Sequence, residues 1–182
     1  MPAIVCLLRG VNMGGNNRMK MEPLRDLFES LRLRNPRTYI QSGNIVFRSN
    51  AKDLDKLASR IQEAIGLGFG FQPDVVLRTA SDLQTVVARN PFAGRTDVAR
   101  DRLVVLFLPS DPSQEVRERV HALNPGPEEI HFDGREIYIH FPNGVSQSKL
   151  SLSAVERALK STWTGRNWNT VLKLLEMAQA TA

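Results

Sequence analysis

"AIVCLL" (Ala3–Leu8) and "LVVLFL" (Leu103–Leu108) are two continuous apolar runs in the chain. Neither run alternates with polar residues, which is typical of a central strand that is covered on both faces. Each run opens one half of the chain, and the elements predicted after it follow the same order in both halves. The two runs therefore predict a repeated arrangement with a buried strand at the centre of each half.

The first half continues with helical and strand patterns on either side of a hairpin signal, Ser42-Gly43. Its elements after the first run are a helix near residues 24–31, strands "RTYIQ" (37–41) and "NIVFRS" (44–49), a helix near 54–65 and a strand at Asp74–Arg78. This order, βαββαβ, is the split βαβ unit of ferredoxin-like domains. Thr79 and Asp82 have the spacing of an N-cap pair, which predicts a further helix.

The second half repeats this order. Its elements after the second run are a helix near 112–123, strands "EEIHF" (128–132) and "EIYIHF" (136–141), a helix opened by the capping box Ser153–Glu156, a short strand "STWTG" (161–165) and a terminal helix. The predicted fold class is therefore α+β, with two ferredoxin-like (βαββαβ) subdomains that are each followed by an extra helix. The predicted division is residues 1–90, a linker at 91–102 without clear periodicity, and residues 103–182.

The chain has 182 residues, a formal net charge of +5 and one cysteine, Cys6, inside the first apolar run. A single cysteine excludes an intrachain disulfide and a cysteine-based metal site. No apolar stretch approaches the roughly 20 residues of a membrane span. These features predict a cytoplasmic protein without membrane contact, and the positive charge favours an anionic partner.

The loop "RGVNMGGNNR" (Arg9–Arg18) joins the first strand to the first helix. Its glycines let backbone N–H groups turn toward an anion, and the helix start adds its dipole. The candidate ligand residues here are Arg9, Asn12, Gly14, Gly15 and the following Lys20. The loop lacks the Gly-Lys-Ser/Thr of a P-loop. The alternative is a tight turn, in which glycine and asparagine adopt positive φ.

Two other polar segments also have two interpretations. "YIQSGN" (Tyr39–Asn44) is first of all a hairpin turn, and the end of a hairpin also brings the amides of Gln41 and Asn44 to a place where they could face a ligand. In "GVSQSKLS" (144–151), Lys149 is either a solvated charge or an anion contact.

The segment "TGRNWNT" (Thr164–Thr170) is polar, although an ordinary helical pattern follows it. On a helix, Trp168 shares an apolar face with Val171, Leu172 and Leu175, so it is predicted to point inward. Other side chains fall on a polar face at the helix start, where free N–H groups and the dipole can hold an anion. The candidate ligand residues of this segment are Arg166, Asn167, Asn169 and Lys173.

Catalytic patterns are missing from the sequence. His121, His131 and His140 lack the H-x-x-x-H spacing, and there is no G-x-S-x-G elbow. No metal site and no cofactor are predicted, the catalytic residues stay unassigned, and whether the chain is an enzyme stays open.

Several ordered motifs resemble those of a bacterial family, domain of unknown function 1697 (DUF1697). The matching segments are "LRGVN" (8–12), Gly14-Gly15, Lys20-Met21, "TYIQSGN" (38–44), Val46-Phe47, "TGRNWNT" (164–170), Lys173-Leu174, "VVLRTASDL" (75–83), "NPF" (90–92) and "SKL" (148–150). The resemblance implies an α+β fold of two ferredoxin-like subdomains. It implies no established reaction.

The function expected from these residues is binding of a phosphate-bearing partner, a nucleotide or nucleic acid held through its phosphates, in a cleft between the subdomains. A base-stacking platform is not expected, because the first strand has no aromatic residue and "NIVFRS" has only Phe47. One alternative is a structural or interaction module without a small ligand. Another is an enzyme for a small anionic substrate, with Arg9, Lys20 and Arg166 as electrostatic clamps.

Overall fold

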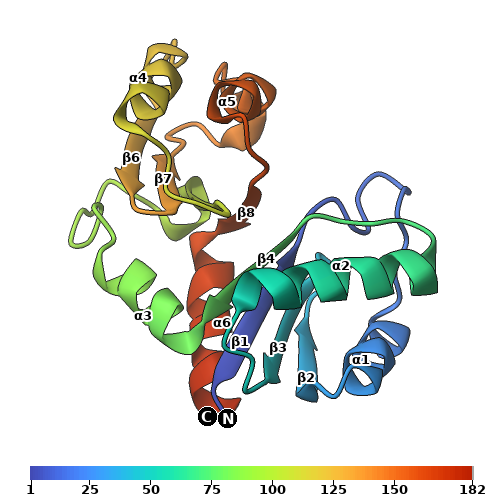
Figure 1. The fold of residues 1–182 in the computed structure, drawn as a ribbon. Coiled ribbons are helices and arrows are strands. Elements are labelled where there is room, and N and C mark those ends of the chain that lie inside the picture. Colours follow the sequence, from blue (N-terminus) through green and yellow to red (C-terminus); the bar gives the residue numbers. More distant parts are fainter. Residues whose placement is uncertain (182) are drawn as a thin grey trace. The chain divides into compact units, whose positions relative to one another are not determined.

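The computed structural model describes residues 1–181, and it contains two four-stranded antiparallel sheets with helices on each (Figure 1). The strand orders are β2-β3-β1-β4 and β6-β7-β5-β8. The two predicted central strands, β1 and β5, are inner strands of their sheets. The predicted α+β fold with two ferredoxin-like subdomains is confirmed.

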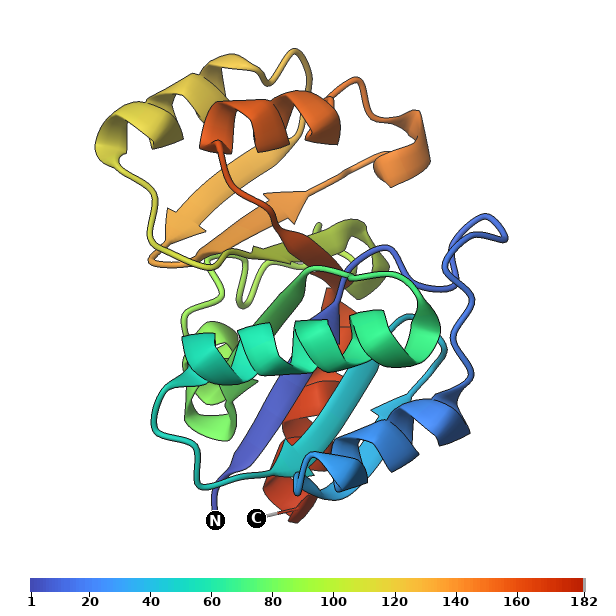
Figure 2. The ribbon, with the colours of Figure 1, turned by 45° about the vertical axis from the view of Figure 1, so that its right-hand side comes forward.

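The first sheet is built by the elements of the first half. Their bounds are β1 (Ala3–Leu8), α1 (Met21–Ser30), β2 (Arg34–Tyr39), β3 (Asn44–Arg48), α2 (Leu54–Phe69), β4 (Val75–Thr79) and α3 (Ala80–Ala88). Helices α1 and α2 cover one face of this sheet (Figure 1, Figure 2). Phe28 of α1 and Ile61 of α2 pack there against Ile4 and Phe47, and all four are buried. Apolar burial on this scale is the main force that holds the helices to the sheet.

The second sheet follows the same plan. Its bounds are η1 (Arg100–Arg102), β5 (Leu103–Phe107), α4 (Gln114–Ala122), β6 (Glu129–Asp133), β7 (Glu136–His140), η2 (Val145–Gln147), α5 (Leu152–Leu159), β8 (Thr164–Asn167) and α6 (Trp168–Thr181). Val120 of α4 and Val155 of α5 are buried against Ile137 and Ile139 of β7. The N-cap of α5 lies two residues before the predicted cap Ser153, because the Ser151 hydroxyl caps the helix by accepting from the N–H of Ala154.

The strand registers show which residues of the two sheets are equivalent. Val5 of β1 lies opposite Arg78 of β4, and Val105 of β5 lies opposite Arg166 of β8. Each arginine is buried and donates from Nη1 to the carbonyl oxygen of the preceding residue. The next residue then caps a helix, Thr79 for α3 and Asn167 for α6. The two strand-to-helix junctions, predicted to be equivalent, have the same construction.

The chain forms two compact units, Met1–Thr85 with the end of α6 from Lys173, and Val86–Leu172. The segment 91–102 thus groups with the second unit. Phe92 within it is buried, and its ring lies edge-on to His131 at 5.1 Å between centroids and close to His140 at 5.7 Å. The division into 1–90, 91–102 and 103–182 stays a prediction about independent folding. Among residues 1–181, no helix has the length and apolar character to cross a membrane.

Candidate anion-binding site

The glycine loop between β1 and α1 is a small hairpin. The backbone N–H of Asn12 donates to the Asn17 oxygen at 3.1 Å, and Met13 and Asn16 form a β-bridge. Gly14 and Gly15, between them, have φ of 59° and 81°. Two consecutive positive φ values are the requirement of a type I′ hairpin turn, and glycine meets it without strain. Gly14 therefore serves the turn, as the alternative interpretation of this loop had it.

The side chain of Asn12 fastens this hairpin to its surroundings. Its Oδ1 accepts from the Met19 N–H at 2.7 Å, while its Nδ2 donates to the carbonyl oxygens of Met19 at 2.9 Å and Gln41 at 2.7 Å. Three bonds use most of the capacity of one amide. Asn12 thus positions the loop against the turn between β2 and β3, and few of its polar atoms are left for a ligand.

A hollow of about 510 Å³ opens between this loop, the start of α1 and the β2–β3 turn. Its lining residues are Asn12, Gly15, Arg18, Met19, Lys20, Met21 and Gln41. Four of them, Asn12, Gly15, Lys20 and Gln41, were predicted from the sequence. Arg18, the last residue of the glycine loop, was not among the predicted ligand residues, because its position beside Lys20 depends on the hairpin conformation of the loop. No carboxylate lines the hollow.

Two cations dominate the electrostatics of this hollow. Arg18 and Lys20 are both exposed, and within residues 1–181 neither forms an ion pair. Lys20 is also the N-cap of α1, with an extended backbone and no side-chain capping bond. The first-turn N–H groups of a helix lack intrahelical partners and carry a partial positive charge. The hollow therefore combines two exposed cations with the positive end of a ten-residue helix.

The turn after β2 supplies the other wall. Asn44 is fully buried, and its Nδ2 donates to the Tyr39 oxygen at 3.1 Å and the Ser42 hydroxyl at 3.0 Å. Asn44 therefore stabilises the hairpin turn, while Gln41 is exposed and lines the hollow. Ile40, which directly precedes Gln41 and is half-exposed, has φ of 48°. A β-branched residue in the left-handed region is strained, and such strain is common beside binding sites.

Arg9 lies away from the hollow. Its Nη1 is 3.8 Å from Oδ2 of Asp74, and its backbone N–H donates to the Asp74 oxygen at 3.1 Å. Asp74 directly precedes β4, so this contact joins the end of β1 to the strand beside it. Arg9 is thus placed to stabilise the sheet.

The segment "TGRNWNT" differs from its predicted form. Its first four residues are strand β8, and the helix begins only at Trp168. Trp168 is buried, as predicted, but the expectation that Arg166 is exposed at a helix start is wrong. Arg166 is 8% exposed and donates to the Thr164 hydroxyl and the Gly165 oxygen, both at 2.8 Å. Pairing with β5 makes this stretch a strand, which sets Arg166 on a covered face.

The other predicted residues of the second half fall in different settings. Asn167 Oδ1 accepts from the Thr170 N–H at 2.9 Å and caps α6. Lys173 pairs with Glu176 at 2.8 Å, one turn along the same helix. Asn169 and Lys149 are exposed, on α6 and just before α5. None of the four lines the hollow beside Lys20. On α6 itself the buried line runs through Trp168, Val171 and Leu174, and not through Leu172 and Leu175, which are half-buried.

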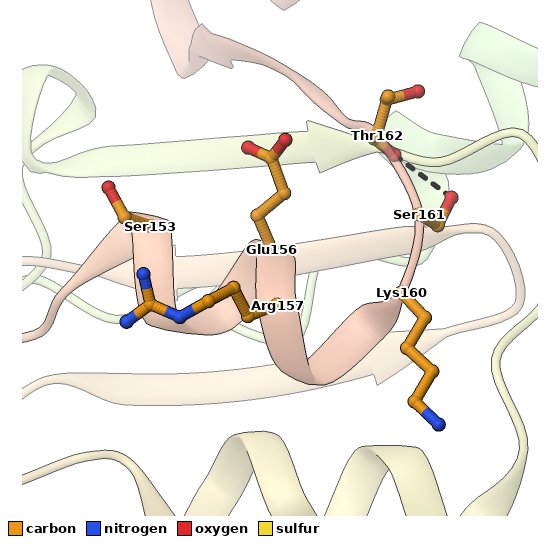
Figure 3. Close-up of a pocket in the computed structure, with 6 residues that line it drawn as sticks. All are labelled: Ser153, Glu156, Arg157, Lys160, Ser161 and Thr162. Atoms are coloured by element: carbon orange, nitrogen blue, oxygen red, sulfur yellow. Dashed lines mark hydrogen bonds between the residues drawn. The ribbon is translucent and has the colours of Figure 1, made fainter.

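A second hollow, of about 560 Å³, lies at the end of α5 (Figure 3). It is lined by Ser153, Glu156, Arg157, Lys160, Ser161 and Thr162. In Figure 3, Glu156 points upward, Lys160 points downward and Arg157 runs along the helix toward Ser153. The charged ends do not converge on one point, and a carboxylate lies among them. This hollow is therefore a weaker candidate for anion binding than the one beside Lys20, although it is slightly larger.

Ionisable groups of the second sheet form a separate network. Arg95 donates to Asp97 and to Glu129, and these bonds lower the pKa of both carboxyls. Burial raises the pKa of the Tyr138 hydroxyl, which donates to the Val86 oxygen at 2.6 Å. Residues 1–181 contain no group of three His, Cys, Asp or Glu side chains arranged to hold a metal ion.

The chain was compared with known proteins. A conserved bacterial protein from Streptococcus pneumoniae has a similar structure, with a TM-score of 0.72 over 97% of this chain and 98% of that one, at 23% identity. This likeness shows a shared fold. No curated protein matches the sequence. The sequence model of a family described as protein of unknown function, DUF1697, matches residues 1–138, and the chain therefore belongs to the DUF1697 family.

Proposed function

We propose that the first unit binds a phosphate-bearing small ligand, such as a nucleotide, in the hollow beside Lys20. The observation that carries this proposal is the pair Arg18 and Lys20 at the uncapped start of α1, without a carboxylate in the lining. Guanidinium and ammonium groups bind phosphate through charge-assisted hydrogen bonds, and helix starts attract anions. A volume of about 510 Å³ lies within the range of small-molecule sites.

The distribution of charge supports the same unit. Thirteen of the 24 Lys and Arg residues, but only nine of the 19 Asp and Glu residues, lie in Met1–Thr85 and the end of α6. Most of the net charge of +5 therefore belongs to the first unit. A positive field raises the local concentration of an anionic ligand and speeds its association.

A thermal-shift series tests this proposal. Inorganic phosphate, nucleotides, sugar phosphates and short oligonucleotides are added to the protein, since a ligand of the folded state raises the melting temperature. We expect at least one phosphate compound to raise it, and Arg18→Ala with Lys20→Ala to abolish the rise. Arg119→Ala, on exposed α4, is the matched control and should retain it. An undiminished rise in the double variant, or no rise with any phosphate compound, would contradict the proposal.

The alternative function, a structural module without a small ligand, is supported by the contacts of four side chains. Asn12, Asn44, Arg166 and Asn167 all bond to the protein's own backbone. Their role as internal ties is favoured over ligand binding. The measurement is the free energy of unfolding: Asn44→Ala should lower it by about 1 to 3 kcal/mol, because buried acceptors lose their donor.

A further inference from the structure

Three arginines stand together at the free edge of the first sheet. Arg34 and Arg37 belong to β2, the edge strand, and Arg48 ends the neighbouring strand β3. Arg34 lies directly opposite Arg48 in the register, and Arg37 lies opposite Val46. We call these three residues the arginine edge.

The arginine edge lies on one face of the sheet. Directly opposite residues point to the same side, and alternate residues of a strand share a side. Val46 and Arg48 alternate along β3, so Arg34, Arg37 and Arg48 all share one face. Ile45 and Phe47 occupy the other face, where α1 and α2 pack. The arginine edge is therefore on the face away from these helices.

Little in the chain balances this positive charge. Arg34 and Arg37 are exposed, and within residues 1–181 no carboxylate lies in ion-pair distance of any of the three. Only Arg48 has a partner, since its Nε donates to the Met1 oxygen at 2.9 Å. Like charges directly opposite on neighbouring strands destabilise a sheet. The stability of the fold alone therefore does not favour the Arg34–Arg48 pair.

The equivalent pair of the second sheet joins a carboxylate to an imidazole. Register places Arg34 and Arg48 where the second sheet has Glu129 and His140. There the imidazole Nδ1 is 3.7 Å from the carboxylate, and Arg95 bonds the same carboxylate. The second sheet thus has a carboxylate at the edge-strand position where the first sheet has Arg34.

Protection of the sheet edge explains part of the arginine edge but not all of it. Charged side chains, proline and bulges prevent edge strands from pairing with other chains. β2 already has Pro36 and a register shift between Arg34 and Arg37. Arg48 lies on the inner strand β3, where it protects no edge. The like-charge pair therefore needs another explanation, and an anion between the guanidinium groups would relieve the repulsion.

We propose that the arginine edge binds the phosphate backbone of a nucleic-acid strand. Arg34 and Arg37 lie opposite Arg48 and Val46, which are two residues apart on β3, so the register shift leaves them about 7 Å apart along the sheet. This span corresponds to about two nucleotides of a strand, at roughly 3.4 Å each. Guanidinium groups bind phosphate oxygens in pairs. Phosphate contacts carry no sequence information, so recognition by the three arginines does not depend on base sequence. This inference goes beyond the small-ligand hollow and does not require it.

Fluorescence anisotropy with a labelled oligothymidylate of about 20 nucleotides tests this inference, since such a strand is long enough for one binding site. The variant is Arg34→Glu with Arg37→Glu, which keeps the edge charged against aggregation. The control is Arg100→Glu with Arg119→Glu, exposed residues of the second unit that give the same net charge. Size-exclusion chromatography and circular dichroism verify folding, and Arg34→Gln replaces the double variant if it does not fold.

We expect wild-type affinity to fall with salt at a log–log slope of roughly −2, as three phosphate contacts to a single strand require. The edge variant should lose about tenfold or more in affinity, since it removes two charge-assisted phosphate contacts and places carboxylates there, and the control should lose much less. Equal losses in the variant and control, or no wild-type binding, overturn the inference. Arg18→Ala with Lys20→Ala should retain oligonucleotide binding while losing the thermal shift with inorganic phosphate, so the two proposals can fail separately.

Discussion

The two halves of this chain share a frame and differ in charge. Both sheets have the same strand order, and both place a buried arginine before a capped helix. The connection from central strand to first helix has twelve residues in the first half (9–20) and six in the second (108–113). The edge strand is "RNPRTY" in the first half and "EIHFD" in the second.

This difference separates the residues that make the fold from those available for binding. The shared features, buried strands and junctions, are occupied by the protein's own contacts. The features found only in the first half, the long glycine hairpin and the arginine edge, leave cations open to solvent. In the second half the corresponding edge is covered by Phe92 and neutralised by Arg95. Phosphate binding is therefore expected in the first half, and the predictions below test the contrast.

The largest expected effect is at the helix start after β8. Trp168 is 6% exposed, and its ring lies 6.4 Å from that of Tyr138, whereas the equivalent first-half position has Ala80. Trp168→Ala should lower the free energy of unfolding by about 3 to 5 kcal/mol through lost burial and a cavity. Urea denaturation measures the change. The adjacent exposed Asn169→Ala should change it by about 0.5 kcal/mol or less, and a similar loss in both variants would contradict the burial of Trp168.

The second-largest loss of stability is expected at the two buried arginines. Arg78→Ala and Arg166→Ala should each lower the free energy of unfolding by about 2 to 4 kcal/mol, because each removes donors from buried carbonyl oxygens and leaves a cavity. Arg78 should have the larger effect, since it is 1% exposed and Arg166 is 8% exposed. Denaturant titration of both variants measures this. If either substitution is neutral, the buried arginine of that junction does not stabilise the fold.

Low pH should lower the stability of the second half, because it protonates the carboxylates that bond to Arg95. Hydrogen bonds from Arg95 lower the pKa of Glu129 and of Asp97. The folded state therefore favours both ionised carboxylates. Their contribution to stability is present above the ordinary carboxyl pKa of about 4, and it is lost as the pH falls through the lowered folded values. The urea midpoint should thus fall more between pH 6 and 3 in wild type than in Arg95→Ala, roughly the window these carboxyls span. Equal pH dependence would show that the network contributes nothing.

The smallest effect has the opposite sign. Arg34→Glu replaces the like-charge Arg34–Arg48 pair by a carboxylate opposite Arg48, and Glu129 is the carboxylate at the equivalent position of the second sheet. It should therefore raise the free energy of unfolding by about 0.5 kcal/mol at low salt, while it weakens oligonucleotide binding. The gain should shrink as salt screens the pair. A loss of stability at low salt would mean that the arginine pair is not repulsive in the folded protein.

Much of the fold could be predicted from the sequence because its signals are local. The apolar runs Ala3–Leu8 and Leu103–Leu108 identify the central strands, and Thr79 with Asp82 identifies a helix cap that the structure contains. Part of the hollow was also predictable, since Asn12, Lys20 and Gln41 stand in polar loops. These loops adjoin strands whose pairing follows from the predicted topology.

The remaining features depend on long-range contacts. Arg166 is buried because β8 pairs with β5, and helical spacing does not reveal this pairing. Phe92 is buried by histidines of two other strands, so its segment had the appearance of a linker. Arg34 faces Arg48 only through a register that contains an irregularity. Local patterns do not determine such a register.

The central claim is that phosphate binds the first half and not the second. The most direct test is a titration of the isotope-labelled protein with inorganic phosphate, followed by amide and arginine side-chain NMR shifts. We predict saturable shifts at the loop and helix start from Asn12 to Met21 and at Gln41, with no saturable shift among residues 103–167. Saturable shifts confined to residues 103–167, or none that saturate, would contradict the account.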